Sequence, residues 1–436
     1  MVYNHVRQFI LKHGVDRTYC VAYSGGLDSQ ALLFALHLLR AEFPFQLKAI
    51  HIHHGLSVHS DKWAAHCQLF CDAHEIQYIE HRLNLQVPKG ESIEEMAREA
   101  RYEFFAKQIN TNDVLLTAHH QDDQAETVLL QLLRGAGLRG LSAMPEMKSF
   151  ASGYHARPFL GLAREALVLF AKEHQLSWHD DESNANQQFS RNFIRHEVMP
   201  LLKSRWPKAA DMFDRSASHC AEAEKLLSEF AFDLMRAARG STSQLLSVKK
   251  VLLLTPAKQR LVLRTWIREA GFSVPDIHQL AMIQSAVLNA KEDRQPAVSF
   301  GEAVVRRYGD DLYLESYFLE MPLGEYEWDF QKPLVIPGVC EITSHEKIGA
   351  GLSLTIAAVT VKFRQGGEVA HVRGKQRHTL KNLFQEWRVP VWERDRTPLL
   401  FHDGKLIAAA GYFVDPDYAA NVHESGRVIV TKKLTN

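Results

Sequence analysis

A hexapeptide near the start of the chain, Ser24-Gly25-Gly26-Leu27-Asp28-Ser29, carries residue types suited to binding a phosphate. Two adjacent glycines let the backbone turn sharply and present several N–H groups to one point. A helical run follows, and the N-terminus of a helix adds partial positive charge. Asp28 would repel a bare phosphate, so its presence indicates Mg²⁺ between the two groups. The loop lacks the lysine of a Walker A motif and the GxGxxG spacing of a dinucleotide site.

A second group of polar residues, His-His-Gln-Asp-Asp-Gln-Ala-Glu-Thr at 119–127, lies where a strand should end and a helix begin. In open α/β sheets ligands bind at the carboxyl ends of strands, so we expect this segment and the hexapeptide to face one crevice. On a helix Asp122 and Glu126 share a face, and Asp123 lies three residues before Glu126. Carboxylates in this arrangement can hold a metal ion or orient a nucleophile. An acidic helix start favoured by the helix dipole is the alternative, and it leaves the two histidines unexplained.

The elements around these segments alternate between short apolar runs and helical patterns. We expect strands at residues 18–24, 47–54, 77–83 and 113–120, with helices between them and after the last. Alternating strands and helices predict right-handed βαβ units and a parallel sheet. The alternation stops after about residue 180, where a helical segment, a small mixed segment and a strand-rich part follow. The predicted fold class is α/β, with one parallel-sheet domain and two smaller mixed α/β domains at the C-terminal side.

Composition and charge exclude several classes of protein. Of the 436 residues 46% are hydrophobic and 23% are charged, which is ordinary for a globular protein. Lys plus Arg and Asp plus Glu are 51 each, which excludes a uniformly basic nucleic-acid binder but leaves room for local basic patches. Five scattered cysteines indicate reduced thiols. No apolar stretch approaches the roughly 18 residues that span a bilayer, and we see no signal peptide, so a cytoplasmic location without membrane contact is expected.

The hexapeptide resembles the SGGxDS signature of the PP-loop family of ATP pyrophosphatases. Further segments resemble one family of enzymes within that superfamily, the tRNA(Ile)-lysidine synthetases; these are residues 119–144, 180–184, 191–197 and 383–395. The resemblance covers most of the chain and is weakest in the middle. It implies a PP-loop ATPase (adenine nucleotide alpha-hydrolase-like) catalytic domain at 1–215, a tRNA-binding middle domain at 216–320 and a C-terminal tRNA-binding domain at 355–436.

The resemblance also implies an activity, that of an ATP-dependent carbon–nitrogen ligase in tRNA processing. ATP would adenylate the 2-oxo group of the wobble cytidine in a minor isoleucine tRNA with a CAU anticodon, releasing pyrophosphate. Free L-lysine would then displace AMP at C2 to give lysidine, and the codon read would change from AUG to AUA. The implied cofactors are ATP and Mg²⁺, and the interpretation allows a homodimer.

Roles for individual residues follow from the same resemblance. The nucleotide would be bound by Ser24, Gly25, Gly26, Leu27, Asp28 and Ser29, and Mg²⁺ by Asp28, Asp122 and Asp123. The implied catalytic residues are Asp28, Asp123, Glu126, Arg101, Arg195 and Asn184. Glu126 would hold or deprotonate the lysine ammonium, and the arginines would face phosphate. For Arg101 and its neighbour Arg98, salt bridges on their own helix are an equally good explanation.

Two local basic segments meet the need of an RNA ligand for phosphate contacts. Residues 187–208 carry five basic side chains and one acidic, and residues 362–396 carry nine basic and four acidic. The expected tRNA-binding residues are Arg134, Arg139, Arg205, Lys375, Arg377 and Lys381. Such basic runs are often simply solvated faces.

Two other functions stay open on the sequence alone. One is a different PP-loop tRNA-modifying enzyme such as a cytidine thiolase, for which Cys67 and Cys71 are poor support. The other is a non-catalytic tRNA-binding protein on the same fold. The acidic residues at 28, 122, 123 and 126 argue against the second, because a protein that only binds RNA gains nothing from carboxylates facing phosphates.

Overall fold

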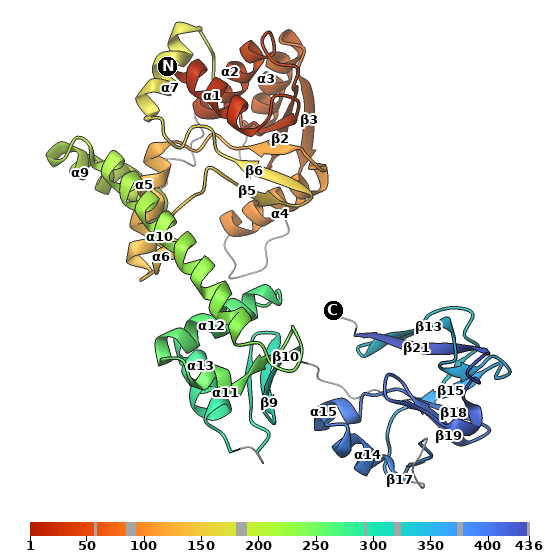
Figure 1. Ribbon diagram of the computed structural model, residues 1–436. Coiled ribbons are helices and arrows are strands. Elements are labelled where there is room, and N and C mark those ends of the chain that lie inside the picture. Colours follow the sequence, from red (N-terminus) through yellow and green to blue (C-terminus); the bar gives the residue numbers. More distant parts are fainter. Residues whose placement is uncertain are drawn as a thin grey trace. The chain divides into compact units, whose positions relative to one another are not determined.

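The computed structural model describes residues 1–55, 59–83, 93–179, 190–291, 294–317, 324–372 and 378–433, with the backbone alone at 93, 94 and 433. The chain divides into two compact units, unit 1 (Met1–Ser228) and unit 2 (Glu229–Asn436) (Figure 1). Within the described ranges, no helix combines the length and the apolar character needed to cross a membrane.

Unit 1 is built on a six-stranded sheet in the order β3-β2-β1-β4-β6-β5. Its strands are β1 (Thr18–Ala22), β2 (Gln46–His53), β3 (Gln77–Arg82), β4 (Val114–Leu116), β5 (Met147–Phe150) and β6 (Gly153–Ala156). All neighbouring strands are parallel except β5 and β6, which form an antiparallel edge. The predicted parallel sheet and its four strands are confirmed. The strands β5 and β6, each four residues long, were not predicted from the sequence.

Helices cover both faces of this sheet, as the alternation of side chains along its strands requires. On β1, Tyr19 and Val21 join one hydrophobic core, whereas Cys20 joins another on the opposite face. The first core includes residues of α1, α2, α3 and α7, and the second includes residues of α4. These helices are α1 (Val2–His13), α2 (Leu27–Leu39), α3 (Ser60–Ala73), α4 (Ile93–Gln108) and α7 (Arg164–Glu173).

The strand order places a ligand crevice next to the hexapeptide. Strand β1 pairs with β2 on one side and with β4 on the other. The chain therefore continues from β1 toward β2 and from β4 toward the opposite edge of the sheet, so the connections after β1 and β4 run in opposite directions. This is the switch point at which doubly wound sheets bind ligands. The hexapeptide follows β1 and leads into α2, and the acidic segment follows β4 and leads into α5 (Gln121–Leu133).

The helical segment predicted for residues 191–240 consists of four consecutive pieces. They are α8 (Ser190–Phe193), a single π-helical turn η2 (Ile194–Val198), α9 (Met199–Arg205) and α10 (Ala209–Ala237). Pro200 lies in the first turn of α9, where its missing N–H costs nothing, so it does not interrupt the helix as expected. Pro207 lies between α9 and α10 and does separate them.

Unit 2 begins with a small mixed part. Its four-stranded antiparallel sheet has the order β7-β10-β9-β8 and packs with helices on a single hydrophobic core. The strands are β7 (Leu246–Ser247), β8 (Ala297–Phe300), β9 (Ala303–Tyr308) and β10 (Asp311–Ser316). The helices are α11 (Val248–Leu252), α12 (Pro256–Glu269), α13 (Ile277–Met282) and the π-helical turn η3 (Ile283–Leu288).

The rest of unit 2 has two larger antiparallel sheets that share a core. One sheet comprises β11 (Tyr326–Trp328), β15 (Val359–Lys362), β18 (Leu399–His402), β19 (Lys405–Ala409) and β20 (Phe413–Val414). The other comprises β12 (Leu334–Ile336), β13 (Cys340–Ile348), β14 (Leu352–Ser353) and β21 (Ser425–Lys433). This part of unit 2 also contains a short strand pair, β16 (Val369–Ala370) and β17 (His378–Thr379). Its helices are α14 (Leu380–Glu386), α15 (Val391–Arg394) and the 3₁₀ turn η4 (Pro416–Tyr418).

The pairing of β13 with β21 bears on the predicted domain boundaries. All nine residues of β13 pair with β21, so the strands from 326 to 353 belong to the same sheets as the C-terminal residues. A C-terminal domain that starts at 355 leaves these strands out, although they contribute Trp328, Ile336 and Ile342 to its core. The boundary expected at 215 falls inside α10. The division into 1–215, 216–320 and 355–436 stays a prediction.

Candidate functional site

The hexapeptide forms a tight loop between β1 and α2. Gly25 has φ +80°, and a Cβ at this position would lie 2.8 Å from Cys67 Sγ, so only glycine fits without a shift. The loop is held by its own serines, because Ser24 Oγ lies 3.0 Å from Ser29 Oγ and Ser29 Oγ donates to the Gly26 carbonyl at 3.1 Å. The local sequence therefore determines a rigid turn at the N-terminus of α2.

A cavity of about 830 Å³ in unit 1 opens beside this loop. It lies at the switch point between β1 and β4, as the sheet order requires. Predicted site residues that line it are Ser24, Gly26, Leu27, Asp28, Ser29, Arg101, Asp122, Asp123, Glu126 and Arg195. The structure thus brings the two sequence segments and the two predicted arginines together around one cavity.

Two buried carboxylates and two arginines form what we call the carboxylate–arginine cluster: Asp123, Glu126, Arg191 and Arg195. Glu126 is 1% exposed. Its Oε1 accepts from Arg195 Nε at 2.7 Å, and its Oε2 accepts from Arg195 Nη2 at 3.0 Å and from Arg191 Nε at 2.9 Å. Asp123 Oδ1 accepts from Nη2 of Arg195 at 2.7 Å and of Arg191 at 3.1 Å. Arginine is suited to such paired contacts because its donors form a fixed fork.

The segment that carries both arginines packs on α5 through apolar side chains. Ile194 and Met199 share a small core with Ala125, which lies between the two carboxylates in sequence. Arg191 and Arg195 are four residues apart, and the π-helical turn begins between them. Single π-helical turns are frequent at functional sites.

The cluster changes the acidity of its members. Burial alone would raise the pKa of Asp123, but the positive charges of His120, Arg191 and Arg195 outweigh it and lower the pKa to about 2. Burial alone would lower the pKa of Arg195, and the hydrogen bond and charge of Glu126 raise it instead. Asp123 is therefore ionised at neutral pH, and Arg195 is firmly protonated.

Asp28 differs from Asp122, whose Oδ1 forms an ion pair with Lys203, because one oxygen of Asp28 has neither a hydrogen bond nor an ion pair among the described residues. Its Oδ1 is buried and accepts no hydrogen bond from any residue in the described part of the chain. Its Oδ2 lies 3.7 Å from His120 Nε2. Burial raises the pKa of Asp28, with the charges of His120 and Arg164 opposing the rise. A buried carboxylate oxygen that faces a cavity without a donor fits a cation ligand such as Mg²⁺.

Some residues around the cavity were not predicted to belong to the site. Arg191 appeared in a basic segment and in the family-like segment 191–197 but was given no role, although its spacing of four from Arg195 on a helical segment was a usable signal. Lys203 is one of the basic side chains of the segment 187–208, and its Nζ lies 2.5 Å from Asp122 Oδ1. Arg164 and His179 also line the cavity. No sequence pattern joins these two residues to the hexapeptide, because the fold alone brings them near it.

The remaining predicted residues have other positions. Asn184, Lys375 and Arg377 lie outside the described residues. The expected RNA contacts that are exposed are Arg134 directly after α5, Arg139 on the short helix α6 (Leu138–Leu141), Arg205 at the end of α9, and Lys381 on α14. Arg205 lies 5.7 Å from the ring of Trp206, which is 58% exposed. Arg98 and Arg101 both line the cavity and lie within 6 Å of the Tyr102 ring, at 5.6 and 5.9 Å.

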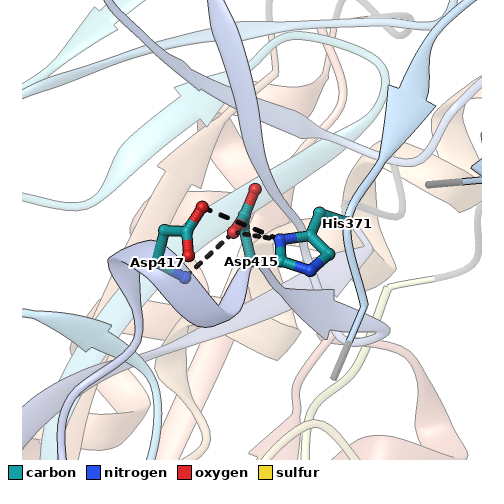
Figure 2. Close-up of side chains that lie close together, drawn as sticks. All are labelled: His371, Asp415 and Asp417. Atoms are coloured by element: carbon teal, nitrogen blue, oxygen red, sulfur yellow. Dashed lines mark hydrogen bonds and ion pairs between the residues drawn. The ribbon is translucent and has the colours of Figure 1, made fainter. Parts of the chain in front are cut away.

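A second ion cluster, the C-terminal cluster, lies in unit 2 and comprises His371, Lys405, Asp415 and Asp417. Figure 2 shows the side chains of His371, Asp415 and Asp417 directed toward one another. His371 Nδ1 lies 3.3 Å from Asp415 Oδ1, and Lys405 Nζ lies 3.4 Å from Asp415 Oδ2 and 3.5 Å from Asp417 Oδ2. Because an ammonium already stands between the two acids, we interpret this cluster as structural.

Three family models match the chain. A PP-loop domain matches residues 2–202, a TilS substrate binding domain matches 246–313, and a TilS substrate C-terminal domain matches 359–430. A tRNA(Ile)-lysidine synthase of Coxiella burnetii is 42% identical over 427 residues, which cover 96% of this chain and 94% of that protein. One of Edwardsiella ictaluri is 40% identical over 403 residues and covers 91% of both. A solved U34-tRNA thiolase of Methanococcus maripaludis is 16% identical, with a TM-score of 0.43 over 51% of this chain and 78% of its own.

The fold and the matching PP-loop domain define the chain as a PP-loop protein, as the SGGxDS resemblance implied. At 42% identity over nearly the full length, the chain belongs to the tRNA(Ile)-lysidine synthase family. The predictions of the family, of the α/β fold class and of an enzyme in tRNA processing are confirmed.

Proposed function

We propose that this chain ligates free L-lysine to C2 of the wobble cytidine in a minor isoleucine tRNA with a CAU anticodon. In the first step the 2-oxo oxygen attacks the α-phosphorus of ATP, and pyrophosphate leaves. In the second step the side-chain amine of lysine attacks C2, the C2–O bond to AMP breaks, and the amine loses its extra protons. The product, lysidine, pairs with A, so the codon read changes from AUG to AUA. Adenylation replaces one difficult displacement by two easier ones.

The observation that carries this proposal is the cavity at the ends of β1 and β4. It joins the hexapeptide loop, five carboxylates and several basic side chains in one place. The hexapeptide supports binding of the pyrophosphate part of ATP, because its residues line the cavity at the N-terminal start of α2. Arg101 and Arg195 are suited to stabilise negative charge that develops on the phosphates.

A divalent cation fits the acids of this site. Asp28 is the best placed ligand because its Oδ1 is buried and has no partner among the described residues. Asp122 would join it once Lys203 moves away, whereas both oxygens of Asp123 already accept hydrogen bonds, from Arg195 and from the His120 N–H. When bound, Mg²⁺ would neutralise phosphate charge and polarise the reacting phosphoryl group.

The carboxylate–arginine cluster suggests how lysine would be accepted. Both oxygens of Glu126 are occupied by guanidinium groups, so Glu126 can receive a lysine ammonium only if Arg191 or Arg195 turns away. An ammonium can replace one cation of the cluster without leaving a buried charge uncompensated. We infer that Arg191 and Arg195 compensate the charge of Glu126 in the absence of substrate, and that they turn toward phosphate when the lysine ammonium binds. Asn184 would position the base or the amine.

The RNA partner is a separate part of the proposal. The exposed basic residues Arg134, Arg139, Arg205 and Lys381, together with Lys375 and Arg377, would supply phosphate contacts. The target base must leave its stack to reach the cavity, as is usual for enzymes that act on single bases. A cytoplasmic location and an assembly of two copies stay predictions.

Incubation of tRNA with ATP, Mg²⁺ and each amino acid in turn tests the proposal. We expect the tRNA to gain the mass of one lysine residue at the wobble cytidine and only with lysine present, with one pyrophosphate released per ligation. Product that requires a sulfur donor would support a thiolase instead. Absence of pyrophosphate release with tRNA, ATP and lysine would support a non-catalytic binding protein.

A further inference from the structure

A chain of hydrogen bonds runs through the interior of unit 1 and ends at the cavity. Arg157 Nη2 lies 3.3 Å from His155 Nδ1, His155 Nε2 lies 2.9 Å from Thr117 Oγ1, and Thr117 Oγ1 lies 2.9 Å from His119 Nδ1. His155 is 0% exposed, and Arg157 and Thr117 are also buried. Thr117 and His119 line the cavity. None of the steps of the proposed reaction uses this chain of hydrogen bonds.

The donors and acceptors in this chain follow in only one order. A guanidinium has N–H donors and no acceptor, so His155 Nδ1 must accept from Arg157 and carries no proton. His155 is then neutral, with its proton on Nε2, and donates to the Thr117 hydroxyl. The hydroxyl has a single hydrogen, which it donates to His119 Nδ1. His119 therefore carries its proton on Nε2, the nitrogen that does not take part in the chain.

The surroundings keep both histidines neutral. Burial lowers the pKa of His155 to about 2, with the charge of Arg157 acting in the same direction. Burial likewise lowers the pKa of His119 to about 3, although the charge of Asp123 opposes it. A histidine with such a pKa is neither a general acid nor a general base at neutral pH. It can still donate one hydrogen bond of fixed direction.

We propose that His119 is a substrate-positioning donor, whose Nε2–H binds an oxygen acceptor of a substrate in the cavity, and that Arg157, His155 and Thr117 fix its tautomer. The acceptor is a carbonyl, phosphate or carboxylate oxygen. The identity of that substrate rests on the proposed function, whereas the tautomer does not. A neutral donor is useful at this place, because a charged one would be drawn into an ion pair with the nearby carboxylates.

A purely structural role is the alternative. Thr117 follows β4 and His155 lies on β6, so the Thr117–His155 hydrogen bond also links two neighbouring strands. The experiments must therefore measure the tautomer of His119 and the rate of turnover, and must check separately that each variant keeps the fold.

Nitrogen NMR of the full chain labelled with ¹⁵N-histidine provides the direct reading, with the His119 signal identified by its loss in His119→Gln. At pH 7 we expect the Nε2–H tautomer in the wild type and in Thr117→Ser, which keeps the hydroxyl. Thr117→Val removes the hydroxyl and should give a mixture of tautomers. Protection of β4 and β6 amides from hydrogen exchange checks that the fold is retained. An Nδ1–H tautomer or an imidazolium in the wild type would overturn the proposal.

Turnover gives the second reading. Removing one positioned donor costs about 10²-fold in enzymes, so we expect Thr117→Val and His119→Asn to lose at least tenfold in lysidine formation. Thr117→Ser should stay near the wild type, and His119→Gln, whose amide can replace Nε2–H, should retain more activity than His119→Asn. The substrate whose KM rises most, among tRNA, ATP and lysine, is the one that supplies the acceptor. Equal activities of the Gln and Asn variants would overturn the donor role.

The two readings fail independently of each other. If the wild type forms no lysidine under any condition, the proposed function fails, and the NMR spectrum still decides the tautomer. If Thr117→Val does not fold, the His119→Gln and His119→Asn pair still decides the donor role, because these changes lie at the cavity end of the hydrogen-bond chain.

Discussion

Unit 1 and unit 2 each gather acidic and basic side chains from distant parts of the chain, but their surroundings differ. The carboxylate–arginine cluster lines a cavity of about 830 Å³ and lies next to Asp28, which has an unpartnered buried oxygen. In the C-terminal cluster Asp415 is 0% exposed and its two oxygens face His371 and Lys405, while its Oδ1 also accepts from the Asp417 N–H at 3.0 Å. Both clusters pair their charges, and the first lines a cavity that could hold a ligand.

The comparison shows that a group of potential metal ligands is not by itself a site. His371, Asp415 and Asp417 have the composition and proximity of a metal centre (Figure 2). A metal ion there would have to displace Lys405, at the cost of moving a paired ammonium. At Asp28 a cation would meet an oxygen that no described residue uses. The two clusters should therefore respond differently to mutation, in activity for the first and in stability for the second.

The largest expected effect is on Asp28. Asp28→Asn should abolish adenylation, reducing pyrophosphate release on the order of 10³-fold because a cation ligand and its charge are lost. The affinity for tRNA should stay nearly unchanged. Asp61→Asn is a matched control, since Asp61 is the second residue of α3 as Asp28 is of α2, but its side chain is 75% exposed. Unchanged turnover in Asp28→Asn would remove this residue from the mechanism.

The C-terminal cluster should affect stability instead. Asp415→Ala leaves Lys405 and His371 without their buried partner, and we expect a loss of about 3 kcal/mol in the stability of the sheets around it. Asp417→Ala should cost less than about 1 kcal/mol, because Asp417 is 61% exposed. Hydrogen exchange of β13, β19 and β21, compared with β1 and β4 in unit 1, measures both changes. Equal losses of stability in the two variants would show that the difference in burial between Asp415 and Asp417 does not matter. A loss of hydrogen-exchange protection in β1 and β4 would show that the cluster also stabilises unit 1.

The sequence predicted the positions of the site where the signal is local. The hexapeptide and the acidic segment are short motifs with fixed places in βα units. The short apolar runs that form β1, β2 and β4, which are largely buried, alternate in the sequence with helical patterns. The topology rule then placed both segments at one crevice. Asp28, Asp123 and Glu126 could be proposed for this reason.

The ion pairs could not be predicted in the same way. Arg191 and Arg195 meet Glu126 across more than 60 residues, because η2 packs on α5 through Ile194 and Met199. His371 and Asp415 come from separate segments of unit 2 that only the fold brings together. The strands β5 and β6 are too short for a clear period, and the pairing of β13 could not be predicted because its partner β21 lies at the end of the chain.

The two arginines of the carboxylate–arginine cluster differ in the number of contacts that they make. Arg195 makes a two-point contact with Glu126 and a further one with Asp123, whereas Arg191 makes one contact with each. Lysine can replace a single contact but not a fork. Lysidine formation should therefore fall about tenfold in Arg195→Lys, the loss typical of one charged hydrogen bond, and less in Arg191→Lys. Steady-state kinetics at saturating tRNA measures the two rates. A larger loss in Arg191→Lys would show that contact number does not determine their roles.

The smallest expected effect concerns RNA binding by the basic segment of unit 2. Replacing Lys375, Arg377 and Lys381 together by Gln should weaken tRNA binding and reduce the slope of log K against log salt by about 2 to 3, since each phosphate contact contributes about 0.7 to 0.9. A matched control replaces Lys347 and Lys432, which are exposed on β13 and β21, and should leave the slope unchanged. Binding measured from low to physiological salt gives both slopes. If the triple variant keeps its slope, these residues form a solvated face, and unit 2 binds tRNA through another surface.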